Sequence, residues 1–123
     1  MKRILLFVGL IGSLNMSAQT YEFESIIDLD ATEIKSQGNT GTCWSYSTTS
    51  FLESEVMRLG NGRHDLSEMY NVRMVYPAKA MNYVRFHGKT QFSQGSLAHD
   101  VINSARDYGV VPEEVYSGLN DGE

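Results

Sequence analysis

Apolar residues recur at helical spacing in three stretches of the chain. The first stretch begins at Cys43, and its expected buried side comprises Trp44, Thr48, Phe51, Leu52, Val56 and Leu59. Spacings of three and four predict an amphipathic helix, and two glycines at positions 60 and 62 end it. The same rules predict that most of the chain after residue 42 is helical.

The next two stretches carry their own start and stop signals. Asp65 followed by Glu68 reads as a capping box that opens a helix, and Pro77 should end or kink that helix at Tyr76. A further helical stretch, 78–86, and a loop, 89–95, precede a third helix over 97–108, which Gly109 closes. We therefore expect a mainly helical chain with little strand.

The segment before the first helix has a different character. Residues 20–36 are acidic with weak alternation of apolar and polar positions, which favours a short strand or an extended arm. Residues 37–42 contain two glycines and an asparagine, the composition of a turn. The turn leads directly into Cys43.

Residues 1–19 have the layout of a secretory signal peptide. Lys2 and Arg3 precede an apolar run over 4–11, and small or polar residues follow as far as Ala18, the expected residue before the cut. The run is about half of the roughly 20 apolar residues that a membrane anchor needs. We expect an exported bacterial protein, secreted or periplasmic, with no membrane anchor once the leader is removed and with residues 20–123 as its domain.

Composition and charge narrow the function further. The 123 residues are 41% hydrophobic and 20% charged, as in ordinary globular proteins, and the net charge of −5 becomes −7 if Lys2 and Arg3 leave with the leader. An acidic chain without a basic cluster is unsuited to nucleic acid. The single cysteine excludes an intramolecular disulfide and a multi-cysteine zinc site.

Cys43 is the candidate nucleophile because a glycine-containing turn passes into a helix at this residue. Free N–H groups and the positive end of the helix dipole favour a thiolate and can receive an oxyanion. Gly41 removes side-chain bulk where a substrate carbonyl would approach. Gln37, six residues upstream, offers an amide donor that the turn could fold back beside the cysteine.

The segment 37–46, Gln-Gly-Asn-Thr-Gly-Thr-Cys-Trp-Ser-Tyr, resembles the active-site segment of papain-like cysteine peptidases. The resemblance implies that Cys43 is the nucleophile and that Gln37 completes the oxyanion hole. Thr40 replaces the cysteine of the Cys-Gly-x-Cys-Trp signature. Thr-Gly-x-Cys-Trp is the pattern of the bleomycin hydrolase and aminopeptidase C branch.

Two further stretches are similar to that branch. Residues 65–70 resemble its Leu-Ser-Glu/Gln segment, and 108–112 resemble its Tyr-Gly-x-x-Pro exit. Gln94-Gly95 resembles the Gly-Gly turn that binds substrate backbone beside the cleavage site, with Gln94 in place of the first glycine. The resemblance spans residues 34–119 and implies an α+β papain-like fold. This chain would supply mainly the helical (left) subdomain with the catalytic helix.

The histidines do not complete a catalytic pair. In papain-like chains the catalytic His lies about 130–150 residues beyond the Cys, whereas 80 residues follow Cys43. We therefore expect His64, His87 and His99 to be structural or surface residues. The sheet-bearing half of the domain, with the catalytic His and Asn, would be missing. Neighbouring His and Asp residues point apart on a helix, so we expect neither a metal site nor a cofactor.

The resemblance implies a cysteine peptidase that hydrolyses peptide or protein substrates through a thioester acyl-enzyme, inactive as this chain alone. Two alternatives stay open: a non-catalytic binding module or gene remnant with a papain-like fold, and a transglutaminase-like cysteine acyltransferase. The sequence leaves open the choice between endopeptidase and aminopeptidase, and the oligomeric state.

Overall fold

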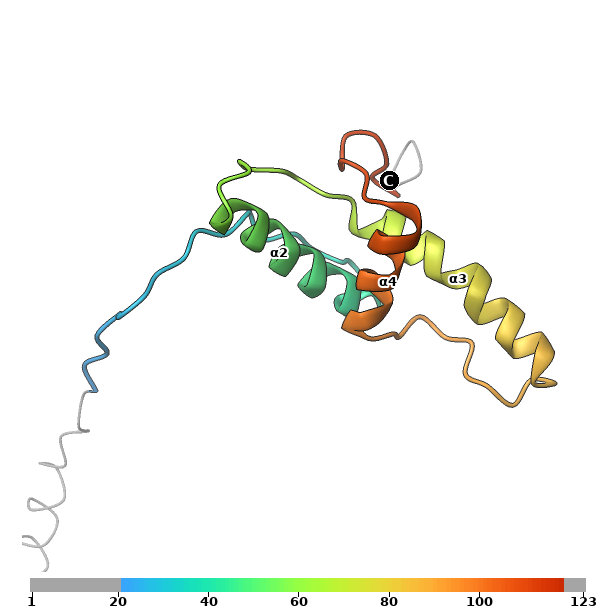
Figure 1. Cartoon of the computed structure of the whole chain (residues 1–123). Coiled ribbons are helices and arrows are strands. Elements are labelled where there is room, and N and C mark those ends of the chain that lie inside the picture. The colour runs from blue at the N-terminus through green and yellow to red at the C-terminus, as the bar shows by residue number, and fades with distance from the viewer. Residues whose placement is uncertain (1–20, 119–123) are drawn as a thin grey trace, which may run out of the picture.

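The computed structural model describes residues 21–118 and contains three helices (Figure 1). They are α2 (Cys43–Arg58), α3 (Glu68–Arg85) and α4 (Ala98–Tyr108). Within these residues there is no strand, and the only strand-like pairing is an isolated antiparallel bridge between Leu66 and Pro112. The prediction of a mainly helical chain is confirmed for the described part. The predicted signal peptide, residues 1–19, lies outside it.

One apolar residue from each helix forms the buried centre of the molecule. Trp44 of α2, Val72 of α3 and Val101 of α4 are 6%, 5% and 0% exposed. Partly buried side chains pack around them: Leu52, Met69, Val75 and Tyr76. This apolar cluster is small, so polar contacts also hold the helices together.

The buried side of α2 is mostly polar. Ser45, Thr49 and Glu53 are at most 1% exposed. Phe51 and Leu59 were expected on this side but are 60% and 65% exposed, so that part of the prediction was wrong. Apolar spacing showed which stretch is helical, but the hydrogen-bonding partners of the small polar residues decide which face is buried.

The start of α3 also differs from the sequence prediction. Ser67, not Asp65, is the N-cap: its hydroxyl accepts a hydrogen bond from the Tyr70 N–H at 3.0 Å. The Asp65 carboxylate instead lies 2.5 Å from the Lys35 ammonium. A serine at this position satisfies a free N–H of the first turn just as an aspartate would.

Pro77 does not end α3, which continues to Arg85. Proline removes the hydrogen bond to the carbonyl four residues earlier, that of Arg73, and its ring crowds that carbonyl. Arg73 is exposed, so water can reach this position. Residues 81–89 are all exposed, and the second half of α3 projects from the body of the molecule (Figure 1).

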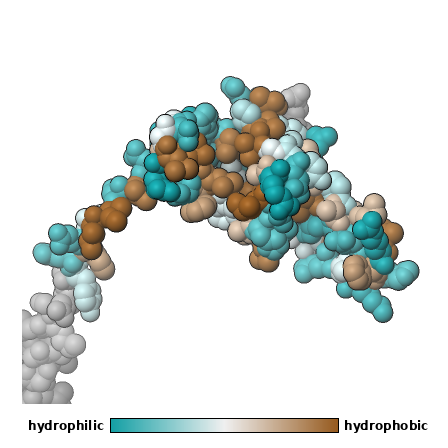
Figure 2. Space-filling model, in the orientation of Figure 1, coloured by the Kyte–Doolittle hydropathy of each residue, from teal (hydrophilic) through white to brown (hydrophobic). Residues whose placement is uncertain are grey.

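The segment before α2 is extended rather than part of a sheet. Residues 21–30 are all exposed and include large apolar side chains such as Phe23 and Ile26, at 94% and 90% (Figure 2). Charge is distributed unevenly along the described chain. Between Tyr21 and Ile34 there are five acidic residues and no Lys or Arg. Residues 69–99 show the reverse, with four Lys or Arg and no acidic residue.

α4 ends as predicted. Gly109 is its C-cap, with a positive φ of 82° that favours glycine, and its N–H donates to the Ala105 carbonyl. Of the apolar residues in the stretch 97–108, only Val101 is fully buried; Leu97 and Tyr108 are 63% and 60% exposed. No helix within residues 21–118 is long and apolar enough to cross a bilayer.

Candidate active site

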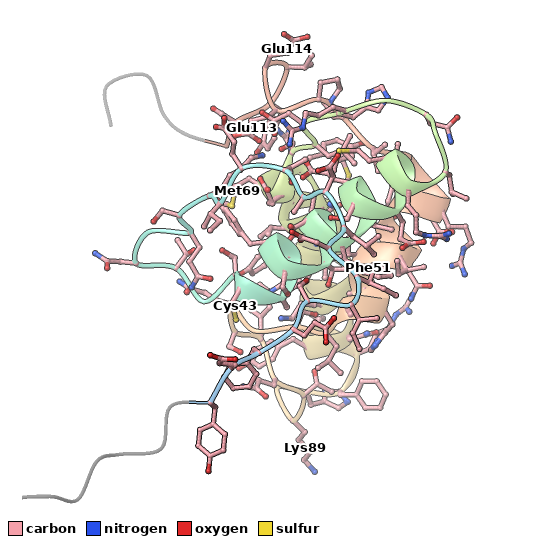
Figure 3. All side chains as sticks on the ribbon, turned by 90° about the vertical axis from the view of Figure 1, so that its left-hand side faces the viewer. Cys43, Phe51, Met69, Lys89, Glu113 and Glu114 are labelled. Carbon is pink, nitrogen blue, oxygen red and sulfur yellow. The ribbon has the colours of Figure 1, made fainter. Side chains whose placement is uncertain are left out.

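Cys43 is the first residue of α2, as the sequence predicts, and its thiol is free and exposed (Figure 3). Thr42 is the N-cap, and its carbonyl accepts hydrogen bonds from the N–H groups of Ser45 and Tyr46 at 2.9 and 3.3 Å. The first turn contains no acidic residue. The positive end of the helix dipole therefore acts on the thiol without a carboxylate in that turn to oppose it.

The turn that leads into α2 is closed by two reciprocal hydrogen bonds. The Gln37 side-chain amide donates to the Thr40 carbonyl at 2.5 Å, and the Thr40 hydroxyl donates to the Gln37 carbonyl at 2.7 Å. A second link joins the Thr40 and Thr42 hydroxyls at 2.6 Å. One of the two N–H groups of the Gln37 amide is thus used to hold the turn. Its part in an oxyanion hole stays a prediction.

The loop that contains Gln94 and Gly95 lies against this turn, 50 residues further along the chain. Gln94 Oε1 accepts the Gly41 N–H at 2.5 Å, and the Gln94 carbonyl accepts the Trp44 indole N–H at 2.9 Å. A Cβ at position 41 would lie 3.0 Å from Gln94 Cβ, tighter than most contacts between real side chains. The structure therefore brings together Gly41, Cys43 and the Gln94-Gly95 loop.

The space beside Gly41 is filled differently from the sequence expectation. We expected the missing side chain to make room for a substrate carbonyl, and in the structure the Gln94 side chain occupies that face and takes the N–H. Substrate binding by Gly41, Gln94 and Gly95 stays a prediction.

Lys79, on α3, holds the same loop from the other side. Its ammonium donates to the carbonyls of Ser93 and Gly95, each at 2.6 Å. Sequence reasoning missed this residue, because a lysine on a predicted helix is usually a solvated surface charge. The only available signal was the absence of any acidic residue between 69 and 99, which leaves Lys79 without a local carboxylate partner.

An ionic cluster, of which only Glu68 is fully buried, is formed by Lys35, just before the turn, with two carboxylates. Lys35 forms ion pairs with Asp65 at 2.5 Å and with Glu68 at 3.1 Å, and it donates to the Leu66 carbonyl at 3.3 Å. Burial lowers the pKa of Lys35, but the hydrogen bonds and ion pairs with the two carboxylates outweigh burial and leave the pKa above its usual range. Because Lys35 is two residues before Gln37, these contacts anchor the turn.

Loss of water has the largest effect on the pKa values of two carboxyl groups near Lys35, those of Glu68 and Glu113. Burial raises the pKa of Glu68, and the hydrogen bond from Lys35 only partly offsets this. Burial likewise raises the pKa of Glu113, with nearby carboxylates adding to the shift although Lys35 lowers it. Glu53, 1% exposed, accepts hydrogen bonds from the Thr32 hydroxyl and from the Leu66 N–H, the latter at 2.7 Å.

The three histidines lie in different parts of the fold, and two of them have polar partners. His64 Nε2 lies 2.8 Å from the Asn61 carbonyl, and His99 lies 3.3 Å from Asp100 on α4. His87 follows the C-terminus of α3 with a left-handed φ of 52°. Residues 21–118 contain no group of three or more His, Cys, Asp or Glu side chains that could hold a metal ion.

Comparison with known proteins agrees with the arrangement around Cys43. Residues 23–116, most of the chain, match the model of the papain family cysteine proteases. A search of curated proteins gives no match. The match covers the turn, Cys43 and all three helices, and the chain belongs to the papain family.

Proposed function

We propose that this papain-family chain carries the nucleophile of a cysteine peptidase, with Cys43 as the attacking residue. The position of Cys43 supports this proposal most strongly: an exposed thiol on the first residue of a 16-residue helix, with no acidic residue in the first turn. The thiolate would attack the peptide carbonyl carbon, and the amine would leave with a proton as the thioester forms.

Stabilisation of the oxyanion would come from N–H groups at the start of α2 and from the Gln37 amide. One Gln37 N–H is engaged by Thr40 and the other would face the substrate. Gly95 would pair with substrate backbone, since its loop is fixed against the turn by Gln94. In this proposal the turn that contains Gln37 and the loop that contains Gly95 would lie on opposite sides of the scissile bond.

The general base would be a histidine other than His64, His87 and His99. Two of these are engaged with Asn61 and Asp100, and His87 lies in the turn after α3. We therefore propose that the chain by itself does not turn over peptides. Peptide hydrolysis that is lost both in Cys43→Ala and in one of the three histidine variants would contradict this assignment.

Within the family, we propose the bleomycin hydrolase and aminopeptidase C branch. The support is the Thr40-Gly41-Thr42-Cys43-Trp44 pattern, in which Thr40 replaces a cysteine and uses its hydroxyl to close the turn. We also propose export, on the basic, apolar and small-residue layout of residues 1–19. N-terminal sequencing of the protein recovered outside the cytoplasm should begin at residue 19 or close to it.

Alkylation of Cys43 tests the nucleophile directly. We expect iodoacetamide to react with Cys43 several-fold faster in the folded chain than in the same chain unfolded in urea, because the N–H groups and the positive dipole end at the start of α2 stabilise negative charge on the sulfur. The adduct is quantified by intact mass. Equal rates for the folded and the unfolded chain would support the alternative of a non-catalytic module.

A further inference from the structure

Gln94 contacts the polypeptide on both sides of Cys43. Its side-chain oxygen accepts the N–H of Gly41, two residues before the cysteine, and its carbonyl accepts the indole N–H of Trp44, one residue after it. The two contacts, at 2.5 and 2.9 Å, fix both the backbone and the side chain of Gln94. Gln94 is therefore held beside the nucleophile although it is exposed.

The Gln94 side chain packs so closely against Gly41 that position 41 has little room for a side chain. An added Cβ at Gly41 would lie 3.0 Å from Gln94 Cβ and 3.1 Å from Gln94 Oε1. Glycine at position 41 thus admits the Gln94 side chain, and that side chain covers the surface that the glycine leaves open. A glycine at position 94 would leave the same surface uncovered.

Lys79 keeps Gln94 in this position. Its ammonium binds the carbonyls of the residues before and after Gln94, Ser93 and Gly95, each at 2.6 Å. Charge-assisted hydrogen bonds are stronger than neutral ones, and two of them to the carbonyls on either side of Gln94 restrict the rotation of the peptide units between them. Gln94 is therefore anchored to α3, through Lys79, as well as to α2, through Trp44.

We propose that Gln94 is a specificity-determining residue, which narrows the approach to Cys43 and selects peptides with a small side chain on the residue whose carbonyl is attacked. This rests on the proposed function. For attack, the carbonyl carbon must come within about 3–3.5 Å of the sulfur. The side chain of that residue begins two bonds from the carbonyl carbon and then lies in the region that the Gln94–Gly41 contact occupies. Glycine and alanine fit beside this contact, and aromatic residues collide with it.

Two affinity labels of different size test the proposal on the full chain. Acetylglycine chloromethyl ketone and acetylphenylalanine chloromethyl ketone each place one residue beside the reacting carbon. The Cys43 thiolate displaces chloride, so an S–C bond forms as the C–Cl bond breaks. We expect the glycine label to react faster than the phenylalanine label. In Gln94→Gly the ratio of the two rate constants should fall about threefold to tenfold.

Matched variants separate this effect from general loosening of the loop. Gln91→Gly introduces the same change at another exposed glutamine of the loop and should keep the wild-type ratio. Lys79→Met should lower the ratio less than Gln94→Gly does, because the Gly41 contact remains. Trp44 is the only tryptophan and is hydrogen-bonded to Gln94, so its fluorescence reports whether the loop stays docked.

An unchanged ratio in Gln94→Gly, with Trp44 emission preserved, overturns the proposal. A ratio that falls equally in Gln91→Gly also overturns it, since loop flexibility alone would then explain the change. The ratio compares two labels on one thiol, so it does not depend on how readily that thiol ionises. Failure of the proposed function would instead appear as equal rates for folded and unfolded chains with both labels.

Discussion

The first turn of α2 and the middle of the same helix have opposite environments. At the start of the helix Cys43 is exposed and its thiol is free. Two to ten residues later, Ser45, Thr49 and Glu53 are almost completely buried, and they are polar. One helix thus presents a reactive group to solvent and buries the kind of side chain that is usually exposed.

Polar contacts explain how this difference is maintained. The Ser45 hydroxyl donates to the Glu68 carbonyl at 2.7 Å, and the Asn71 amide donates to the Thr49 hydroxyl at 3.3 Å. Hydrogen bonds are directional, so they fix the rotation of α2 about its axis more closely than apolar contacts would. The orientation of Cys43 is therefore set by the buried polar face behind it.

Removing the central polar residue should have the largest effect. Glu53→Ala leaves the Leu66 N–H and the Thr32 hydroxyl without their acceptor, which should lower the free energy of unfolding by about 2–4 kcal/mol. Urea denaturation followed by circular dichroism measures the change. Glu55→Ala is the control, because Glu55 only pairs with Arg58 at the surface, and that variant should stay close to wild type. Equal effects of the two variants would contradict the importance of the buried face.

A smaller effect should appear in the pH dependence of stability. Burial raises the folded-state pKa of Glu113 above its ordinary value of 4.5, so the folded chain binds this proton more tightly than the unfolded chain does. The contribution to stability is then greatest below pH 4.5 and is lost as the pH rises through the folded-state pKa. In Glu113→Gln the free energy of unfolding should therefore fall less steeply from about pH 4.5 towards neutral pH.

The neighbouring residue provides the control for this experiment. Glu114 is exposed at the tip of the same turn, and Glu114→Gln should reproduce the wild-type pH profile (Figure 3). Urea denaturation at a series of pH values gives the comparison. A steeper fall in Glu113→Gln than in wild type would show that ionised Glu113 stabilises the fold and would reverse the interpretation of its burial.

The smallest effect is expected at the reactive end of the helix. Cys43→Ala removes an exposed thiol and should change the free energy of unfolding by less than about 0.5 kcal/mol, while it abolishes the alkylation described above. Thermal and urea denaturation of this variant and of Glu53→Ala compare the exposed start of α2 with its buried middle. A loss as large as that of Glu53→Ala would mean that Cys43 is part of the core.

Sequence reasoning predicted the helices and the place of Cys43 because both depend on local signals. Glycines at 60 and 62 follow the end of α2, Gly109 caps α4, and the turn before Cys43 is formed by consecutive residues. Pro77 does not end its helix, as the sequence had suggested it could, because the cost of a proline depends on whether the unpaired carbonyl can reach water, which is a property of the fold.

The partners of polar residues could not be predicted. Lys35 and Glu68 are 33 residues apart, and Lys79 reaches a loop 14 to 16 residues further on. A capping pattern at Asp65 and Glu68 pointed to a helix start, while both carboxylates are ion-paired to Lys35. Long-range pairing is decided by how the helices pack. Because the apolar centre is small, the hydrophobic pattern of the sequence did not show which helix faces pack together.

The uneven distribution of charge has a consequence for encounters with other molecules. The extended segment 21–34 carries five negative charges, and the projecting half of α3 lies in the stretch without any acidic residue, at the other end of the molecule (Figure 1). Such a separation gives the molecule an electric dipole moment on top of its net charge of −5. At low ionic strength the dipole orients charged peptides before contact, and at physiological salt this steering is confined to about 8 Å.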